Sequence, residues 1–432
     1  MGRLSLKALS PQLSKQVKQY LVITGNYWAF TLTDGALRML VVLYFHQLGY
    51  SPLNIALLFL FYEIFGVITN LVGGWLGARL GLNKTMNIGL ALQIIALSML
   101  AVPPEMLTIF YVMAAQALSG IAKDLNKMSA KSAIKYLVPK GDNGSLYRWV
   151  AVLTGSKNTL KGIGFFMGGL LLTLLGFKGA IMLMASLLAL VWVFSLLTLK
   201  EDLGKAKNKP KFTDIFSKSS SINILSAARL FLFGARDVWF VVALPVFLAV
   251  NFNWDHWWVG GFMASWIIGY GLVQSVAPLI TGNNAGNSTE KGVESGTEKV
   301  TDKKQGKVPT GKTAFMWASY LTLIPAAIAL ALHFDFYTQA SLIFGLLIFG
   351  GVFAINSSLH SYLIVSYASS DGVSLDVGFY YMANAMGRLI GTLLSGWIYQ
   401  AYGLESCLWI SALFLALTTL ISTKLPVESC SK

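Results

Sequence analysis

The feature that most constrains the fold is a series of long apolar segments. Residues 53–76, 180–199 and 404–420 each contain at most one charged side chain. At about 1.5 Å per residue, a helix of this length crosses a hydrocarbon layer roughly 30 Å thick. Across the 432 residues, 55% are hydrophobic and only 12% are charged, which is too little charge to cover a soluble protein of this size. The sequence therefore predicts an all-α integral membrane protein with about twelve transmembrane helices.

The basic residues are distributed unevenly between the predicted loops. The formal net charge is +14, but the charges gather in alternate loops, as in membrane proteins, and so do not indicate nucleic acid. One side receives Arg3, Lys7, Lys15, Lys18, Arg79, Lys84, Lys135, Lys140 and the lysines of 200–218 and 291–312; the other has Lys178 beside Glu105, Asp255, Asp335 and Glu405. The positive-inside rule then places both termini in the cytoplasm of a multi-pass protein of the bacterial inner membrane.

A repeated pattern of small residues divides the chain into two halves. A constant offset of 227 residues aligns Gly164, Gly168, Gly169 and Gly176 with Gly391, Ser395, Gly396 and Gly403. The same offset aligns Lys161 with Arg388. We predict two pseudo-symmetric six-helix halves, residues 1–199 and 222–426, joined by a cytoplasmic linker at 200–221, with a flexible cytoplasmic loop at 283–312.

Several ionisable residues fall inside the predicted spans. A charge near the bilayer centre costs at least ~2.5–3.5 kcal/mol, so each of these residues is a functional candidate. Asp34 and Arg38 lie four residues apart on one helical face, which favours an ion pair. Lys157 and Lys161 have the same spacing, and two like charges on one face require a counter-ion.

The predicted cations outnumber the acids. We expect substrate to be bound by Arg38, Lys157, Lys161, Arg236, Arg388, Lys123, Lys127 and Arg229, and charge pairing or proton coupling to involve Asp34, Asp124, Asp237 and Glu63. The eight cations exceed Asp34, Asp124 and Asp237 by five (8 − 3). Such a cavity suits a polyanion, since arginine offers a planar fork of donors for phosphate-like oxyanions. Purely structural roles are alternatives to substrate binding: Asp34 and Arg38 as a structural ion pair, Lys127 as a solvated helix end, and Glu63 as a packing residue.

Enzymatic and metal-binding functions are not expected. The two cysteines, Cys407 and Cys430, form neither a disulfide framework nor a thiolate metal site. The four histidines are scattered, and no nucleophile–base pair has suitable spacing. The sequence also contains no soluble signalling module of the kind a receptor needs. We therefore predict a transporter with no cofactor and no bound metal.

The turn after the second span resembles the loop motif of the major facilitator superfamily. Residues 74–84 (GWLGARLGLNK) keep that motif's glycines, Arg79 and Lys84. Ala78 stands where an aspartate is usual, which removes the acidic partner of that motif's gating salt bridge. The resemblance implies the twelve-helix fold of that superfamily.

Four charged motifs resemble the organoarsenical efflux permeases of the ArsJ family. They are residues 26–38 (NYWAFTLTDGALR), 119–131 (SGIAKDLNKMSAK), 155–158 (GSKN) and 232–239 (LFGARDVW). The resemblance implies export of 1-arseno-3-phosphoglycerate, made when a glyceraldehyde-3-phosphate dehydrogenase uses arsenate, and hence arsenate resistance. Arg38 and Arg236 also resemble the two phosphate-gripping arginines of organophosphate–phosphate antiporters. We expect a monomer in the lipid bilayer; uniport and proton antiport both stay open, and another organic phosphate or polyanion is the alternative substrate.

Overall fold

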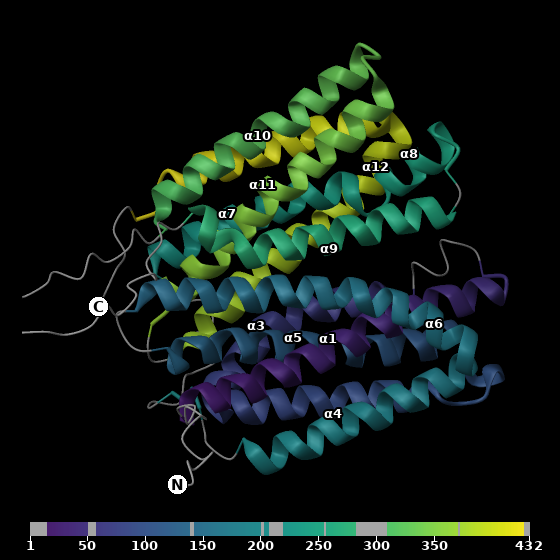
Figure 1. The fold of residues 1–432 in the computed structure, drawn as a ribbon, viewed down its shortest axis with the longest axis vertical. Helices are drawn as coiled ribbons and strands as arrows, with labels where there is room; N and C mark the ends of the chain where they lie inside the picture. Colours follow the sequence, from purple (N-terminus) through teal and green to yellow (C-terminus); the bar gives the residue numbers. More distant parts are fainter. Residues whose placement is uncertain are drawn as a thin grey trace, which may run out of the picture.

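The computed structural model describes residues 15–50, 58–138, 142–199, 203–206, 219–254, 256–281, 309–369 and 372–426. All regular secondary structure in these ranges is helical. Figure 1 shows two groups of helices, α1–α6 and α7–α12, side by side with their axes roughly along one direction. The predicted all-α fold is confirmed. The proposed division at 199 and 222 stays a prediction, because most of the 200–221 linker and of the 283–312 loop lies outside the described residues.

The bounds of the helices follow the apolar segments of the sequence. They are α1 (Lys15–Gln47), α3 (Leu60–Leu80), α4 (Leu82–Leu100), the short η2 (Pro104–Met106), α5 (Ile109–Leu137), α6 (Asn143–Thr198), α7 (Ser220–Phe240), α8 (Ala243–Asn251), α9 (His256–Thr281), α10 (Gly311–His333), α11 (Thr338–Tyr367) and α12 (Val373–Ser422). Among the described residues, eight helical segments are long and apolar enough to cross a membrane, with α7 and α8 counted together. Exposed apolar side chains such as Leu190, Phe194, Leu323, Leu393 and Trp397 cover the outer surface of these segments, as expected where lipid is the solvent.

The two longest helices each double back at a glycine. Gly176 in α6 has φ 66° and ψ 177°, and Gly403 in α12 has φ 77° and ψ −177°. These left-handed conformations favour glycine, which has no Cβ. Six of the eight segments provide one span each, and α6 and α12 provide two each. With α4 and α5 added, the described residues form twelve spans (6 + 4 + 2). The breaks lie 227 residues apart, so the internal repeat predicted from the sequence is present in the backbone.

The repeat also appears in helix packing. A Cβ added to Gly164 of α6 would lie 2.7 Å from the carbonyl oxygen of Leu32 in α1. A Cβ added to its counterpart, Gly391 of α12, would lie 2.7 Å from the carbonyl oxygen of Gly234 in α7. Small residues permit this approach of backbones in each half. It brings the residues around Lys161 close to α1 and those around Arg388 close to α7.

Tight packing joins the two halves on the face where α1 begins and α12 ends, which we call the terminal face (left in Figure 1). A Cβ on Gly74 of α3 would lie 2.5 Å from the carbonyl oxygen of Ser374 in α12, whose Oγ donates a 2.8 Å hydrogen bond to the Gly74 carbonyl. A second contact joins α6 to α9, where a Cβ on Gly155 would lie 2.4 Å from the carbonyl oxygen of Gly271. The interface between the halves is therefore built on backbone contacts.

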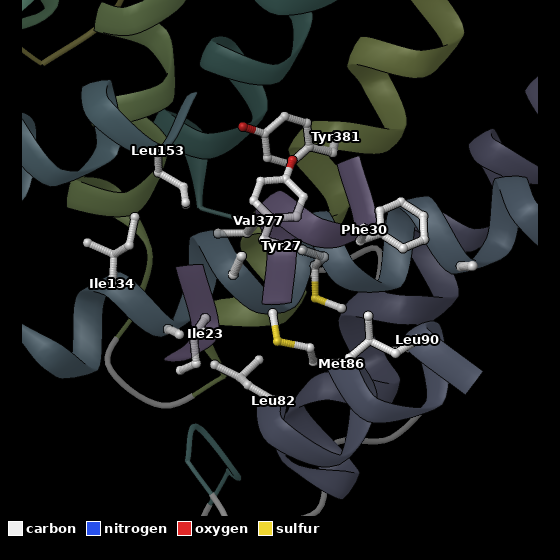
Figure 2. Close-up of a cluster of buried hydrophobic side chains, with 14 of the residues drawn as sticks. Ile23, Tyr27, Phe30, Leu82, Met86, Leu90, Ile134, Leu153, Val377 and Tyr381 are labelled. Atoms are coloured by element: carbon white, nitrogen blue, oxygen red, sulfur yellow. The ribbon is translucent and has the colours of Figure 1, made fainter. Parts of the chain in front are cut away.

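Apolar side chains strengthen the same contact. Figure 2 shows Val377 and Tyr381 of α12 inside the cluster formed with Ile23 and Tyr27 of α1 and Ile134 of α5. All five side chains are buried. Dispersion contacts of this kind are the main attraction between helices in a bilayer. The start of α12 therefore belongs to the core of the first group of helices as much as to its own.

The turn between α3 and α4 is held by backbone hydrogen bonds. Leu82 donates its amide to the Leu203 carbonyl at 2.8 Å, and Ala206 donates its amide to the Ala78 carbonyl at 2.8 Å. Ala78 is fully buried at the position where the superfamily motif has an aspartate. Residues 203–206, the described part of the predicted linker, thus pack on this turn without an acidic side chain.

Candidate functional site

An acidic side chain between two arginines lies where the halves meet. Glu63 Oε1 of α3 is 3.1 Å from Arg38 Nη2 of α1 and 3.6 Å from Arg388 Nη2 of α12. The three side chains keep 31%, 26% and 30% of their surface exposed, although all three lie within transmembrane segments. Arg38 Nε is buried and has no hydrogen-bond partner among the described residues. The group is therefore open to solvent through its partly exposed side chains, while Arg38 Nε beneath them has no hydrogen-bond acceptor among the described residues.

A second carboxylate organises the arginines of the second half. Asp237 of α7 is fully buried; its Oδ1 accepts a 2.6 Å hydrogen bond from Arg236 Nε, and its Oδ2 lies 3.2 Å from Arg388 Nε. Asp237 thus forms ion pairs with both Arg236 and Arg388. Its oxygens are used by two guanidinium groups, which fixes both in place.

Asp34 has a different partner from the one expected from its spacing. The Tyr62 hydroxyl donates a 2.6 Å hydrogen bond to Asp34 Oδ1. Arg38, one turn along α1, pairs instead with Glu63, and its guanidinium lies 4.8 Å from the Tyr62 ring centroid. Tyr62 and Glu63 are consecutive in α3, so this one helix supplies the partners of both α1 residues. The expected ion pair between Asp34 and Arg38 is absent.

The lysines of α5 surround one acid. Asp124 is 1% exposed and lies 2.5 Å from Lys127 Nζ and 3.6 Å from Lys123 Nζ. Lys123 Nζ also sits 3.8 Å from the Tyr62 ring centroid, and Lys127 Nζ sits 4.6 Å from that of Tyr381. With 14% of its side chain exposed, Lys127 is mostly buried and is not a solvated helix end.

Lys157 and Lys161 of α6 have no acidic side chain within ion-pair distance among the described residues. No carboxylate in the described part of the chain lies within 4.0 Å of Lys157 or Lys161, and Lys157 Nζ has only Asn158 Oδ1 at 3.3 Å. Lys161 lies within electrostatic range of Arg38 and Arg388, and Lys157 within that of Lys127; Asp34 lies within electrostatic range of both lysines. The described residues therefore give these two lysines no directly paired counter-ion, and Asp34 offsets their charge only from a distance.

Arg229 is held by the protein itself. Its side chain is 3% exposed; Nε donates to Asn384 Oδ1 at 2.9 Å and Nη1 to the Ser357 carbonyl at 3.3 Å. The guanidinium also stacks 3.9 Å from the Phe233 ring centroid. Arg229 therefore belongs to the packing of the second half rather than to the group around Glu63. Asn384 was not a predicted site residue, although the offset of 227 makes it the counterpart of Lys157.

Lys135 closes the terminal face and was not among the predicted site residues. Its Nζ, on the last turn of α5, donates hydrogen bonds to the Val365 and Ser366 carbonyls at 2.8 and 3.1 Å and to the Ala368 carbonyl. These carbonyls end α11, where the helix dipole attracts a cation. The signal was in the sequence, since Lys123, Lys127, Lys131 and Lys135 follow one another at four-residue spacing. Lys135 of the first half thus binds the end of α11 in the second half.

Replacing Lys135 by methionine is expected to open the terminal face, because methionine keeps the apolar stem and removes all three donors. The measurement is the distance between spin labels on Arg148→Cys and Lys312→Cys, exposed terminal-face positions of α6 and α10, in a variant whose native cysteines are serine. We expect the population to shift toward longer distances. Lys424→Met, which removes an exposed lysine of the same face, serves as the control. Unchanged distances in Lys135→Met would show that the apolar contacts alone hold this face closed.

The assembled group has more positive than negative charge. Seven of the eight predicted cations remain once Arg229 is assigned to packing, and against Asp34, Glu63, Asp124 and Asp237 they leave an excess of three (7 − 4). In a site of low dielectric constant this excess attracts a multiply charged anion. Among the described residues, no group of three or more histidine, cysteine or acidic side chains could hold a metal ion. Cys407 is buried in the apolar core of the second half.

Two six-helix groups related by an internal repeat, with a polar site where they meet, define a membrane transporter. Residues 23–289 match the sequence model of the Major Facilitator Superfamily. The chain belongs to this superfamily and is a multi-pass membrane protein. A search of curated proteins finds no significant match.

Solved structures of other transporters share the fold. The human organic anion transporter MFSD10 (TETRAN) aligns with a TM-score of 0.70 at 16% identity, over 94% of this chain and 99% of its own. The proton:xylose symporter XylE, bound to 6-bromo-6-deoxy-D-glucose, aligns with a TM-score of 0.69 at 13% identity, over 95% and 96%. A bacterial homologue of the iron transporter ferroportin, in the outward-facing state, gives 0.69 at 11% identity, over 94% and 98%. Identities this low establish the fold alone.

Proposed function

We propose that this transporter exports 1-arseno-3-phosphoglycerate from the bacterial cytoplasm and so confers arsenate resistance. One observation carries the choice of a polyanion: among the described residues no carboxylate lies within 4.0 Å of Lys157 or Lys161, and both lysines lie within electrostatic range of Arg388. The choice of arsenic rests on the four sequence motifs that resemble organoarsenical efflux permeases. Pentavalent arsenic, like phosphorus, is bound through its oxygens, whereas trivalent arsenic prefers thiolates.

The charges suggest two binding poles. Arg38, Arg388 and Lys161 form an arginine-rich pole for one oxyanion. Lys157, which is within electrostatic range of Lys123 and Lys127, forms a lysine-rich pole for the other. A glycerate with a phosphate at one end and an arsenate ester at the other matches this division. Arg236, tied to Asp237, orients Arg388 in this proposal and completes the first pole.

The proposed direction of transport follows from charge and geometry. The positive-inside rule makes the terminal face cytoplasmic. Lys135 and the contact of α3 with α12 close that face. In this proposal the partly exposed arginines would therefore be reached from the periplasmic side. Rocking of the halves would then alternate access. The membrane potential favours the exit of anions by about 2.3 kcal/mol per charge per 100 mV, or about 7 kcal/mol for three charges.

The proposed partners are few. An arsenate-using glyceraldehyde-3-phosphate dehydrogenase would supply the substrate, which is too unstable to be taken up from outside. The transporter would act as a monomer with no cofactor and no chemical step of its own. Asp34 and Asp124 would hold Tyr62 and the α5 lysines in place. In this scheme Arg229 contributes to substrate entry indirectly, because its hydrogen bonds to Asn384 and Ser357 hold α7 in position.

The decisive experiment measures arsenic in living cells. An arsenate-exposed bacterium without its own arsenic exporters would express this chain with or without the arsenate-using dehydrogenase. We expect lower arsenic accumulation only when both proteins are present. Equal accumulation in all strains would reject the organoarsenical substrate.

Another organic phosphate or polyanion is the alternative substrate, because a cationic site does not distinguish arsenic from phosphorus. One structural neighbour is named as an organic anion transporter, which is compatible with this alternative. Uptake of radiolabelled 3-phosphoglycerate into proteoliposomes, in competition with a panel of phosphate esters and dicarboxylates, would separate the two. Strong transport of a stable ester together with no effect on cellular arsenic would favour the alternative.

A further inference from the structure

We propose that Glu63 is the resident counter-anion of the empty site. Its carboxylate occupies the place between Arg38 and Arg388 that one oxyanion of the substrate takes, and it returns there when the substrate leaves. The proposal rests on the proposed function as a polyanion transporter and adds how the empty transporter resets.

Glu63 differs from the other acids in what it connects. Within the described ranges, its contact with Arg388 is the ion pair that joins the first half to the second. Asp124 pairs with lysines of its own helix, and Asp237 with arginines of its own half. One oxygen, Glu63 Oε1, faces both guanidinium groups. An oxyanion of the substrate would present an oxygen to the same two groups.

Glu63 also differs in how easily it can be displaced. It keeps 31% of its side chain exposed, whereas Asp237 and Asp124 keep 0% and 1%. Removing a buried acid from its partners leaves unpaired charges in a low-dielectric interior and is costly. A partly exposed ion pair is weak and is exchanged with little loss. Glu63 is therefore the acid that an arriving anion can replace.

The uncompensated cations explain why a counter-anion is needed. Arg38 and Lys161 of the first half face Arg388 of the second within electrostatic range. When the halves close around an empty site, these like charges approach in a medium that screens them poorly. Glu63, which lies within electrostatic range of Lys123 and Lys161 as well, offsets this repulsion. The transporter can then reorient without substrate, which permits net transport rather than obligatory exchange.

The test compares binding, net transport and exchange in purified full-length protein. Radiolabelled 3-phosphoglycerate, with a phosphate at one end and a carboxylate at the other, is the probe. For Glu63→Gln we expect the Kd of the probe to fall about fivefold or more, the usual scale of coupling between competing ligands. Net efflux from proteoliposomes should slow by about tenfold, while exchange against unlabelled probe stays within about twofold of wild type. Glu63→Asp, which keeps the charge, should recover much of the net efflux.

The outcomes separate this proposal from the proposed function. Glu405→Gln, which removes an exposed acid paired with His333, should leave all three quantities unchanged. If wild type transports the probe but Glu63→Gln binds it no better, or slows efflux and exchange equally, the counter-anion role is overturned. Wild-type protein that exchanges the probe without net efflux would overturn it too. If wild type neither binds nor transports the probe, the polyanion function itself fails.

Discussion

Alanine at Arg38 is expected to abolish transport while the protein still folds in the membrane. The change removes the guanidinium that faces Glu63 and whose Nε has no partner in the described structure. Losing one charged, partly desolvated contact costs about 2 kcal/mol or more, so binding of 3-phosphoglycerate should weaken at least thirtyfold. Equilibrium binding and efflux from proteoliposomes measure the effect, and gel filtration checks folding.

Arg236→Ala should lose transport as well, because Asp237 then pairs with Arg388 alone and the arginine-rich pole loses one guanidinium group. Lys178→Ala removes an exposed cation beyond the Gly176 break and is the matched control for lost charge. Unimpaired transport by both arginine variants, with Lys178→Ala also normal, would remove these residues from the substrate site.

Asparagine at Asp237 is expected to cause the largest loss of stability. The carboxylate is fully buried and is the partner of both Arg236 and Arg388. Breaking a buried ion pair by removing one partner costs about 3–5 kcal/mol, since the remaining charges stay buried without compensation. The thermal unfolding temperature of the purified protein in detergent should fall clearly.

A double variant tests the reason for this loss. Adding Arg236→Gln to Asp237→Asn removes one uncompensated charge and should recover part of the unfolding temperature. Asp335→Asn, at an exposed turn between α10 and α11, is the control and should change little. An unfolding temperature equal to wild type in Asp237→Asn would mean that water, rather than Asp237, balances the two arginines.

The architecture was largely predictable because lipid imposes strong rules on sequence. The length of each apolar segment predicts a transmembrane helix, because backbone polar groups in a bilayer must form their hydrogen bonds within helices. The glycine repeat predicted the equivalence of α6 and α12, because few other residues tolerate such close packing. The structure added the breaks at Gly176 and Gly403, where a positive φ favours glycine. Local rules of this kind can be read one segment at a time.

The partners of the charged residues were harder to predict. Helical spacing predicted an ion pair between Asp34 and Arg38. In the structure, Tyr62 of α3 donates a hydrogen bond to Asp34, and Glu63 of α3 pairs with Arg38. Lys135 looked like a loop cation that marks topology, but it fastens the end of α11 more than two hundred residues away in the chain. Spacing along one helix shows which side chains share a face, and it does not show which other helix approaches that face.

The sequence by itself determined that this protein is a bundle of about twelve membrane-spanning helices with more cations than acids in its spans. It did so because apolar length, small-residue spacing and charge are properties of single segments. Only the tertiary structure decided which cations keep a protein partner and which remain without one. Arg229 is satisfied by Asn384, whereas Lys161 lies within electrostatic range of Arg38 in its own half and of Arg388 across the interface. Electrostatic interactions fall off with distance, so the charge available to a substrate depends on how the two halves bring these residues together.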